Sequence, residues 1–264
     1  MPSVLAIAGS DSSGGAGVQA DLKTYAALGV YGTCAITAVT AQNTLGVSAV
    51  HELPPEIVAA QIDAVVSDIR PDAVKTGMLA NAAIVEVVAS KVRQYALRTL
   101  VVDPVMVAAS GDRLLREDAV QALRDLLLPL ADVTTPNIPE AEALVGYELR
   151  TYLQLREAAR EIHAMGPRNV VITGGHKEGS AVVDILFDGR DFREFAAPRI
   201  ETTSTHGSGC TFASAIAAYL ALGEPVQDAV GRAKEYVTEA LRQAYPIGHG
   251  HGPVHHFHEW WDDA

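Results

Sequence analysis

The sequence has few cysteines, few basic residues and no long apolar run, and each shortage excludes a class of protein. Only Cys34 and Cys210 are cysteines among 264 residues, which excludes a disulfide scaffold and predicts a reducing, cytoplasmic location. Lys and Arg number 20 against 32 Asp and Glu, so the formal net charge of −12 argues against a nucleic-acid partner. No stretch reaches the about 18 apolar residues of a membrane helix, so no membrane partner is expected.

The apolar residues that are present form short runs separated by helical patterns. Strands are expected at residues 4–8, 32–39, 73–77, 99–103, 132–135 and 169–173. Helices are expected near residues 16–28, 55–68, 81–96, 116–128, 138–145, 151–165, 209–222 and 225–243. Apolar runs that do not alternate with polar residues, separated by helices, predict a mostly parallel sheet covered on both faces.

One segment departs from this pattern. Residues 181–187 and 192–195 flank Asp188 and Gly189, a dipeptide typical of a β-hairpin turn. No low-complexity linker and no internal repeat divides the chain. We therefore expect a single α/β domain over residues 1–264, with a small β-hairpin. In such sheets, ligands bind beyond the carboxyl ends of the strands, where several polar motifs stand in this sequence.

A glycine-rich segment, residues 9–17, follows the first predicted strand and opens a helix. Glycines let a backbone approach a ligand closely, but the segment lacks the Gly-Lys-Ser/Thr ending of a P-loop. Asp21 comes about two helical turns after Gly14, where its carboxylate could hydrogen-bond a hydroxyl or ring amine. An ordinary turn between a strand and a helix is the alternative interpretation.

A second glycine-rich segment, residues 205–210, precedes an apolar helix of small residues. Backbone N–H groups at such a helix start, here around Gly207 and Gly209, form an anion site that suits a transferred phosphoryl group. Cys210 stands in the first helical turn, where the helix dipole favours the thiolate, a proton acceptor for a substrate hydroxyl. A small buried structural cysteine is the alternative.

Polar residues follow two further predicted strands. Asn137 and Glu140 are three residues apart at a helix start, so they can face one side. Asp103 ends a buried strand, which Pro104 cannot continue in a central position. The carboxylates of Asp103 and Glu140 suit Mg²⁺, which needs few acidic ligands and retains waters, and the amide of Asn137 would lie near nucleotide phosphates. Simple helix capping is the alternative for Asn137 and Glu140.

Taken together, these segments resemble the hydroxymethylpyrimidine and phosphomethylpyrimidine kinase family. Each motif is short, and their joint occurrence in one order makes the resemblance specific. The matching residues span nearly the whole chain: 6–17, 19–21, 37–44, 75–79, 103–105, 135–137, 140–141, 173–176, 205–210 and 248–257.

The resemblance implies a three-layer, α/β/α, ribokinase-like fold, the cofactors ATP and Mg²⁺, and a homodimer. It implies phosphorylation of 4-amino-5-hydroxymethyl-2-methylpyrimidine and then of its monophosphate, in thiamine biosynthesis. Catalysis would fall to Cys210, Gly207 and Gly209, and metal binding to Asp103 and Glu140. The pyrimidine pocket would be lined by Gly9, Asp21, Gln42, Met78 and Val105, and the nucleotide would contact Asn137, Thr173, Thr205 and Ser208.

Two positions depart from the family pattern, and other functions stay open. Thr173 stands where many relatives have a lysine, and His255 stands where asparagine is usual. Five of the nine histidines fall within residues 249–258, where we expect a glycine-rich closing segment rather than a metal tract. Pyridoxal kinase activity, alone or combined with the pyrimidine activity, is the alternative enzyme. A non-catalytic nucleotide-binding module and a Rossmann dehydrogenase, which lacks its glycine pattern here, are weaker rivals.

Overall fold

Strand β1 (Ser3–Asp11) lies inside the sheet, and its side chains are mostly buried, on both faces of the sheet. The computed structural model describes residues 1–106, 117–175 and 180–261. Side chains of a strand point alternately to opposite faces, so Ile7 of β1 packs on one side of the sheet and Ala6 on the other. Because each face is apolar, each must be buried under helices.

The described residues form a nine-stranded sheet in the order β3-β2-β1-β4-β5-β6-β7-β8-β9. From β2 through β7 in this order the neighbouring strands run parallel, whereas β3, β8 and β9 join antiparallel. Register is fixed on both sides of β1, where Leu5 pairs with Thr33 of β2 and Val74 of β4. The strands after β1 are β2 (Tyr31–Asn43), β3 (Gly46–Glu52), β4 (Ala73–Thr76), β5 (Leu100–Val102), β6 (Val133–Thr134), β7 (Asn169–Gly175), β8 (Ala181–Phe187) and β9 (Phe192–Pro198).

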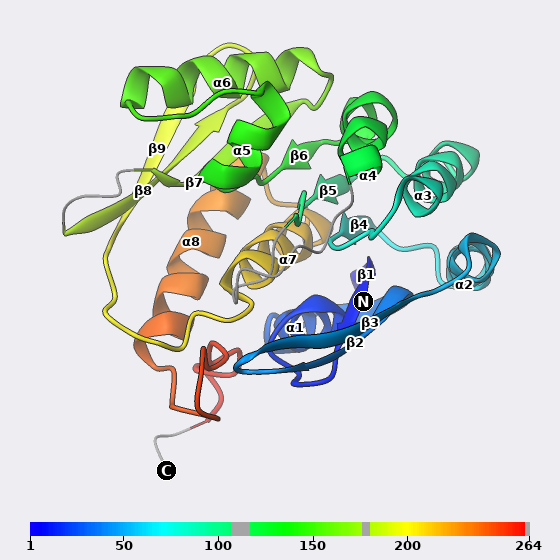
Figure 1. Ribbon diagram of the computed structural model, residues 1–264, viewed down its shortest axis with the longest axis horizontal. Helices are drawn as coiled ribbons and strands as arrows, with labels where there is room; N and C mark the ends of the chain where they lie inside the picture. The colour runs from blue at the N-terminus through cyan, green and yellow to red at the C-terminus, as the bar shows by residue number, and fades with distance from the viewer. Residues whose placement is uncertain (107–116, 176–179, 262–264) are drawn as a thin grey trace.

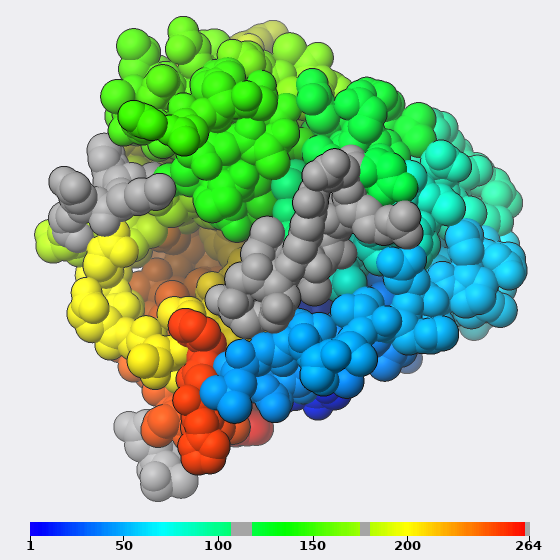
Figure 2. All heavy atoms as spheres, viewed as in Figure 1, coloured from blue at the N-terminus to red at the C-terminus, as the bar shows by residue number. Residues whose placement is uncertain are grey.

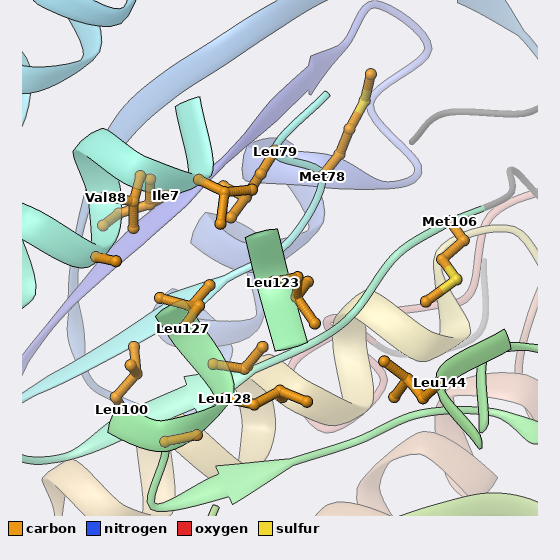
Figure 3. Close-up of a cluster of buried hydrophobic side chains, with 14 of the residues drawn as sticks. Ile7, Met78, Leu79, Val88, Leu100, Met106, Leu123, Leu127, Leu128 and Leu144 are labelled. Atoms are coloured by element: carbon orange, nitrogen blue, oxygen red, sulfur yellow. The ribbon is translucent and has the colours of Figure 1, made fainter. Parts of the chain in front are cut away.

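Helices cover the sheet in two layers (Figure 1). One layer contains α1 (Gly17–Ala27), α7 (Ser208–Ala221) and α8 (Val226–Arg242). The other contains α2 (Pro55–Asp68), α3 (Ala82–Gln94), α4 (Glu117–Ala122), α5 (Ile138–Val145) and α6 (Tyr152–Ala164). Leucines after α4 join Ile7, Leu79 and Leu100 in the core on that side (Figure 3). The predicted three-layer α/β/α class is therefore confirmed.

Most predicted elements are present with shifted ends. The hairpin of β8 and β9 is confirmed, and Asp188 Oδ1 accepts hydrogen bonds from the backbone N–H groups of Arg190 and Asp191. The helix expected at residues 116–128 is divided, since α4 is followed by a π-helical turn (Leu123–Leu127) and a 3₁₀ turn (Leu128–Leu130). Its residue 116 lies outside the described residues, as does residue 176 of the 173–176 motif.

Strand β3 is the element that the sequence analysis missed. It pairs antiparallel with β2 at the edge of the sheet, and its side chains are mostly exposed. An exposed edge strand has no apolar face to bury, so hydrophobic patterning gives no signal for it. None of the described helices is long and apolar enough to cross a membrane.

The strand order locates the functional edge of the sheet. The chain passes from β1 to β2 on one side and later returns to β4 on the other, so the order reverses at β1. Ligands of open α/β sheets bind at such a reversal, outside the carboxyl ends of the strands. The loops that follow β1, β4, β5, β6 and β7 all leave from this edge.

Candidate active site

A cavity of about 870 Å³ opens at the carboxyl ends of the parallel strands. Figure 2 shows the surface hollowed between the green atoms of the α5 region and the yellow atoms that follow β9. Every predicted site residue except Asp21 lines this cavity: Gly9, Gln42, Met78, Asp103, Val105, Asn137, Glu140, Thr173, Thr205, Gly207, Ser208, Gly209 and Cys210.

The first glycine loop, residues 9–17, is organised around the carboxylate of Asp11. Asp11 Oδ1 accepts from the backbone N–H of Ser13 at 2.8 Å, and Oδ2 accepts from that of Ala16 at 2.8 Å. Oδ2 also lies 2.8 Å from Nε2 of His206. Although burial opposes ionisation, the hydrogen bonds from His206, Ser13 and Ala16 lower the pKa of Asp11 to about 2. Asp11 is therefore an anion throughout the neutral pH range.

The second glycine loop, residues 205–210, leads into α7. Gly207 has φ +78°, in the left-handed region, and a Cβ there would lie 1.8 Å from the carbonyl oxygen of Gly15. Helix α7 begins at Ser208, and no side-chain cap covers its first turn. Residues 208–210 line the cavity, so the positive end of the helix dipole meets it. This is an arrangement that binds anions.

Cys210 stands half-buried in the first turn of α7. Burial raises the pKa of its thiol to about 12, with the positive charge of Lys75 opposing the shift and the negative charge of Asp103 adding to it. The thiolate expected from the helix dipole is thus not the resting form, because desolvation outweighs the dipole. At neutral pH Cys210 carries its proton.

Asp103 and Glu140 follow the neighbouring strands β5 and β6. Asn137 Oδ1 accepts from Glu140 N, and Glu140 Oε2 accepts from Asn137 N, each at 2.9 Å, so the capping interpretation is confirmed as a reciprocal capping box. Burial raises the pKa of Asp103 to about 6, against the opposing charge of Lys75. Burial and the charge of Asp103 raise the pKa of Glu140 to about 8. A cation bound beside them would lower both pKa values and so favour the ionised form of each acid.

A free acceptor atom points to the same conclusion. Within the described part of the chain, Asp103 Oδ2 is buried without a hydrogen-bond partner. No group of three or more His, Cys, Asp or Glu side chains among the described residues could hold a metal alone. A cation at Asp103 and Glu140 would therefore take its remaining ligands from water and from the phosphates of a nucleotide, as Mg²⁺ does.

Asp21 departs from its predicted place on the pocket wall. Its side chain is fully buried, with Oδ1 2.8 Å from Lys75 Nζ and accepting from Ser214 Oγ at 2.6 Å. Lys75 Nζ also lies 3.8 Å from Asp103 Oδ2. Asp21 therefore neutralises a buried ammonium behind the site and does not line the cavity. The sequence carries a signal for this pair, because Lys75 interrupts an apolar strand and a buried lysine needs a carboxylate.

The remaining predicted pyrimidine-pocket residues come from β1, β2 and the segments after β4 and β5. Gly9 allows close packing, since a Cβ there would lie 3.0 Å from Sδ of Met78. Gln42 Oε1 accepts from Thr40 Oγ1 at 3.0 Å, and its Nε2 lies 3.5 Å from Nε2 of His206. The sequence analysis quoted Asp11 and His206 within motifs but gave neither a role.

The cavity extends to charged residues that the sequence analysis also missed. Asp184 Oδ1 accepts from the backbone N–H of Gly174 at 2.9 Å, next to Thr173. Asp184 Oδ2 pairs with Lys234 Nζ at 2.8 Å, and both side chains line the cavity. A carboxylate in the middle of the apolar strand β8 is the sequence signal that could have identified this pair.

The C-terminal segment contacts the β2–β3 turn and the second glycine loop. His251 N donates to the carbonyl oxygen of Thr44 at 2.8 Å, and His206 N donates to that of Gly252 at 2.9 Å. A Cβ at Gly250 would lie 2.1 Å from the Thr44 oxygen, so glycine permits this approach. The glycine-rich segment thus joins the β2–β3 turn to the second glycine loop, and none of residues 248–257 lines the cavity.

Residues 11–255 match the phosphomethylpyrimidine kinase family. The chain belongs to this family. It is 50% identical over 254 residues to the hydroxymethylpyrimidine/phosphomethylpyrimidine kinase of Bacillus subtilis, with 96% of this chain and 94% of that protein covered. The resemblance predicted from the motifs is confirmed.

Two further relatives differ in length and in name. The thiamine biosynthesis bifunctional protein of Geobacter sulfurreducens is 56% identical over 254 residues, which cover 96% of this chain and 52% of that protein. The chain therefore spans about half the length of that relative. The pyridoxal kinase of Bacillus subtilis, solved as an ADP complex, superposes with a TM-score of 0.92 at 41% identity, covering 99% of this chain and 100% of that chain. The ribokinase-like fold is confirmed.

Proposed function

We propose that the chain transfers the γ-phosphoryl group of ATP to 4-amino-5-hydroxymethyl-2-methylpyrimidine and then to the resulting monophosphate, in thiamine biosynthesis. One observation carries the proposal: the cavity lined by Gly9, Gln42, Met78 and Val105 also contains the first turn of α7. An acceptor alcohol and a migrating phosphoryl group can then meet in one enclosed site. Family members named for both phosphorylations support the same assignment.

The acceptor side suits a flat, polar-edged ring. The amide of Gln42 offers both a donor and an acceptor, which complements the edge of an aminopyrimidine. Met78 and Val105 supply apolar surface for the ring faces. Gly9 removes the side chain that would otherwise occupy the space beside Met78.

The phosphoryl side suits a transferred anion. The backbone N–H groups at Gly207 and Gly209 would stabilise the charge on the migrating group, with the helix dipole adding to their field. Asn137, Thr173, Thr205 and Ser208 would contact the nucleotide through neutral amide, hydroxyl or backbone groups. Thr173 supplies no positive charge, so neutralisation of the nucleotide phosphates falls to other groups.

Asp103 and Glu140 are the residues that would hold Mg²⁺. The buried, unpartnered Oδ2 of Asp103 and the raised pKa values of both acids support this assignment. When bound, Mg²⁺ would neutralise phosphate charge during the transfer. Oε2 of Glu140 accepts from Asn137 N in the capping box and Oε1 accepts from Met106 N at 3.4 Å, which together fix the direction of the carboxylate.

The thiolate form of Cys210 would accept the proton of the hydroxymethyl group in the first reaction, so the resting thiol must first lose its own proton. The second reaction needs no strong base, because its nucleophile is a phosphate oxygen that is largely ionised near neutral pH. We expect Cys210→Ala to slow the first phosphorylation about 100-fold and the second only a few-fold. Separate assays started from the alcohol and from the monophosphate measure this difference. Equal losses in both would assign Cys210 to packing.

The function is tested by mass spectrometry of the products formed from ATP, Mg²⁺ and the hydroxymethylpyrimidine. We expect the monophosphate to appear first and the diphosphate to follow, with ADP formed at each step. Omission of Mg²⁺ should abolish both products. ATP binding without either product would favour a nucleotide-binding module instead.

Pyridoxal kinase activity is a second candidate, favoured by the superposition on the Bacillus subtilis pyridoxal kinase across nearly the full chain. Pyridoxal and the pyrimidine are both flat rings with a hydroxymethyl group, so the same pocket can present either alcohol. A competition assay with both acceptors and limiting ATP measures the preference. A larger kcat/KM for pyridoxal would make it the principal substrate.

Location and assembly are part of the proposal. The low cysteine count supports a cytoplasmic enzyme. The homodimer expected from the family resemblance is tested by size-exclusion chromatography with light scattering. A particle of one chain mass, 27.9 kDa, would contradict it.

A further inference from the structure

The two glycine loops contact each other through their backbones. A Cβ at Gly207 would lie 1.8 Å from the carbonyl oxygen of Gly15, and a Cβ at Gly15 would lie 2.3 Å from Cδ2 of His206. Neither loop can therefore approach the other more closely. Behind the loops, Ser214 Oγ of α7 donates to Asp21 Oδ1 of α1 at 2.6 Å, and between the loops themselves a side-chain contact opposes separation.

One carboxylate holds both loops. Asp11 Oδ2 accepts from the N–H groups of Gly15 and Ala16 in its own loop, at 3.1 and 2.8 Å, and is 2.8 Å from Nε2 of His206 in the other. Asp11 and His206 are 3% and 5% exposed, so water competes weakly for this contact. A carboxylate only accepts, so Nε2 of His206 carries the proton and donates it.

His206 is fixed by one further hydrogen bond and lies beside the predicted acceptor pocket. Its backbone N–H donates to Gly252 in the C-terminal segment at 2.9 Å. Its Nε2 also lies 3.5 Å from the amide nitrogen of Gln42, the side chain assigned to the pyrimidine edge, but both nitrogens carry hydrogens and so form no hydrogen bond with each other. His206 thus links the predicted acceptor pocket, the first loop and the chain that enters α7.

We propose that His206 is a positioning residue whose bond to Asp11 sets the separation of the two glycine loops, and with it the alignment of acceptor and γ-phosphoryl group. The role rests on the proposed function, because the first loop then borders the acceptor and the second holds the phosphoryl group. In productive transfer, the bond between γ-phosphorus and the ADP oxygen breaks and a bond to the acceptor oxygen forms, while the acceptor loses its hydroxyl proton.

Loosening the pair has a specific chemical consequence. If the loops separate, the acceptor oxygen no longer lies in line with the γ-phosphorus, and water can take its place. Water then receives the phosphoryl group, which gives ADP and inorganic phosphate. The ratio of ADP formed to phosphoryl groups transferred to the acceptor, counting two for each diphosphate, should therefore rise above one, and this ADP ratio does not depend on how much of the enzyme is folded.

A matched pair of amides at position 206 tests the role. The terminal nitrogen of glutamine can take the place of Nε2, whereas asparagine is one methylene too short to reach Asp11. We expect His206→Asn to lower kcat about 10- to 100-fold and to raise the ADP ratio, since small misplacements have effects of this size. His206→Gln should stay near the wild-type ratio. Asp11→Asn should resemble His206→Asn, and the double variant should lose little more than either single one.

Two controls separate this role from general damage and from the proposed substrate. His256 is equally buried and bonds Thr211 of α7, but does not line the cavity, so His256→Gln should keep the ratio at one. Hydrogen exchange of residues 11–17 and 205–210, measured without substrate, should speed up in His206→Asn and not in His206→Gln. Equal hydrogen exchange in the two amide variants would overturn the proposal even for a chain that phosphorylates neither acceptor, and equal ADP ratios would overturn it for an active chain. Failure on the pyrimidine alone would overturn only the substrate assignment.

Discussion

Asp11 and Asp103 stand at the carboxyl ends of two parallel strands and line the same cavity, yet their acidities shift in opposite directions. Their exposed fractions are similar, 3% and 5%. The pKa of Asp11 falls to about 2, whereas that of Asp103 rises to about 6. Burial opposes the ionisation of both acids, more strongly at Asp103, so the direction of each pKa shift depends on whether hydrogen bonds outweigh it.

The difference lies in the donors that surround each carboxylate. Asp11 receives hydrogen bonds from backbone N–H groups, from Ser13 and from His206, and these favour its charged form. Asp103 has a distant ammonium, Lys75 at 3.8 Å, and an oxygen with no hydrogen-bond partner among the described residues. The fold satisfies one acid and leaves the other for a ligand. We therefore expect Asp11→Asn to reduce the stability of the fold and Asp103→Asn to reduce activity without reducing stability.

Asp103→Asn should have the largest effect on activity. Loss of the charge removes a ligand of the proposed cation, and we expect kcat/KM to fall about 100- to 1,000-fold, as for other electrostatic groups at reacting centres. The free energy of unfolding should stay unchanged or rise, because a buried charge is removed and Lys75, 3.8 Å from Asp103, keeps its closer partner Asp21 at 2.8 Å. Kinase assays and urea unfolding at the same pH measure the two quantities. A large loss of stability with preserved kcat would reverse the assignment.

Much of this comparison could be reached from the sequence, and part of it could not. The glycine loops, Asp103 and Glu140 stand directly after apolar strands, so strand order alone gathers them at one edge. Local pattern carries no information about contacts between distant residues, which is why Asp21 was assigned to the pocket when it pairs with Lys75. The same limit hid the bond between Asp11 and His206.

Cys210 shows a second limit. Its place at a helix start was read correctly from the sequence, but its ionisation was not. A helix dipole is visible in a sequence, whereas desolvation depends on what the rest of the chain packs around the thiol. Strand β3 was missed because its side chains are mostly exposed, so the strand has no buried apolar pattern by which a sequence could reveal it.

Asp11→Asn should reduce stability where Asp103→Asn does not. The carboxylate has a lowered pKa in the folded state, so its contribution is complete above the unfolded value near 4 and is lost as the pH falls towards about 2. A shift of this size corresponds to about 2 kcal/mol at pH 7. Urea unfolding of both proteins between pH 7 and acid measures it. A stability difference that is the same at every pH would assign the loss to packing.

His256→Gln extends the comparison to a base, and it should change the free energy of unfolding less than Asp11→Asn does. His256 hydrogen-bonds Thr211, and burial, with the nearby charges of Lys23, His255 and His258 adding, lowers its pKa to about 3. Below the unfolded value near 6.5 the unfolded chain binds a proton that the folded chain excludes, so acidification destabilises the wild type. At pH 5.5 this difference amounts to about 1.4 kcal/mol relative to pH 7.5. The variant should lack this part of the pH dependence, although His258, whose pKa burial also lowers, keeps its own share. Unfolding free energies at the two pH values measure the effect, and identical pH slopes in both proteins would show that His256 is protonated in the fold.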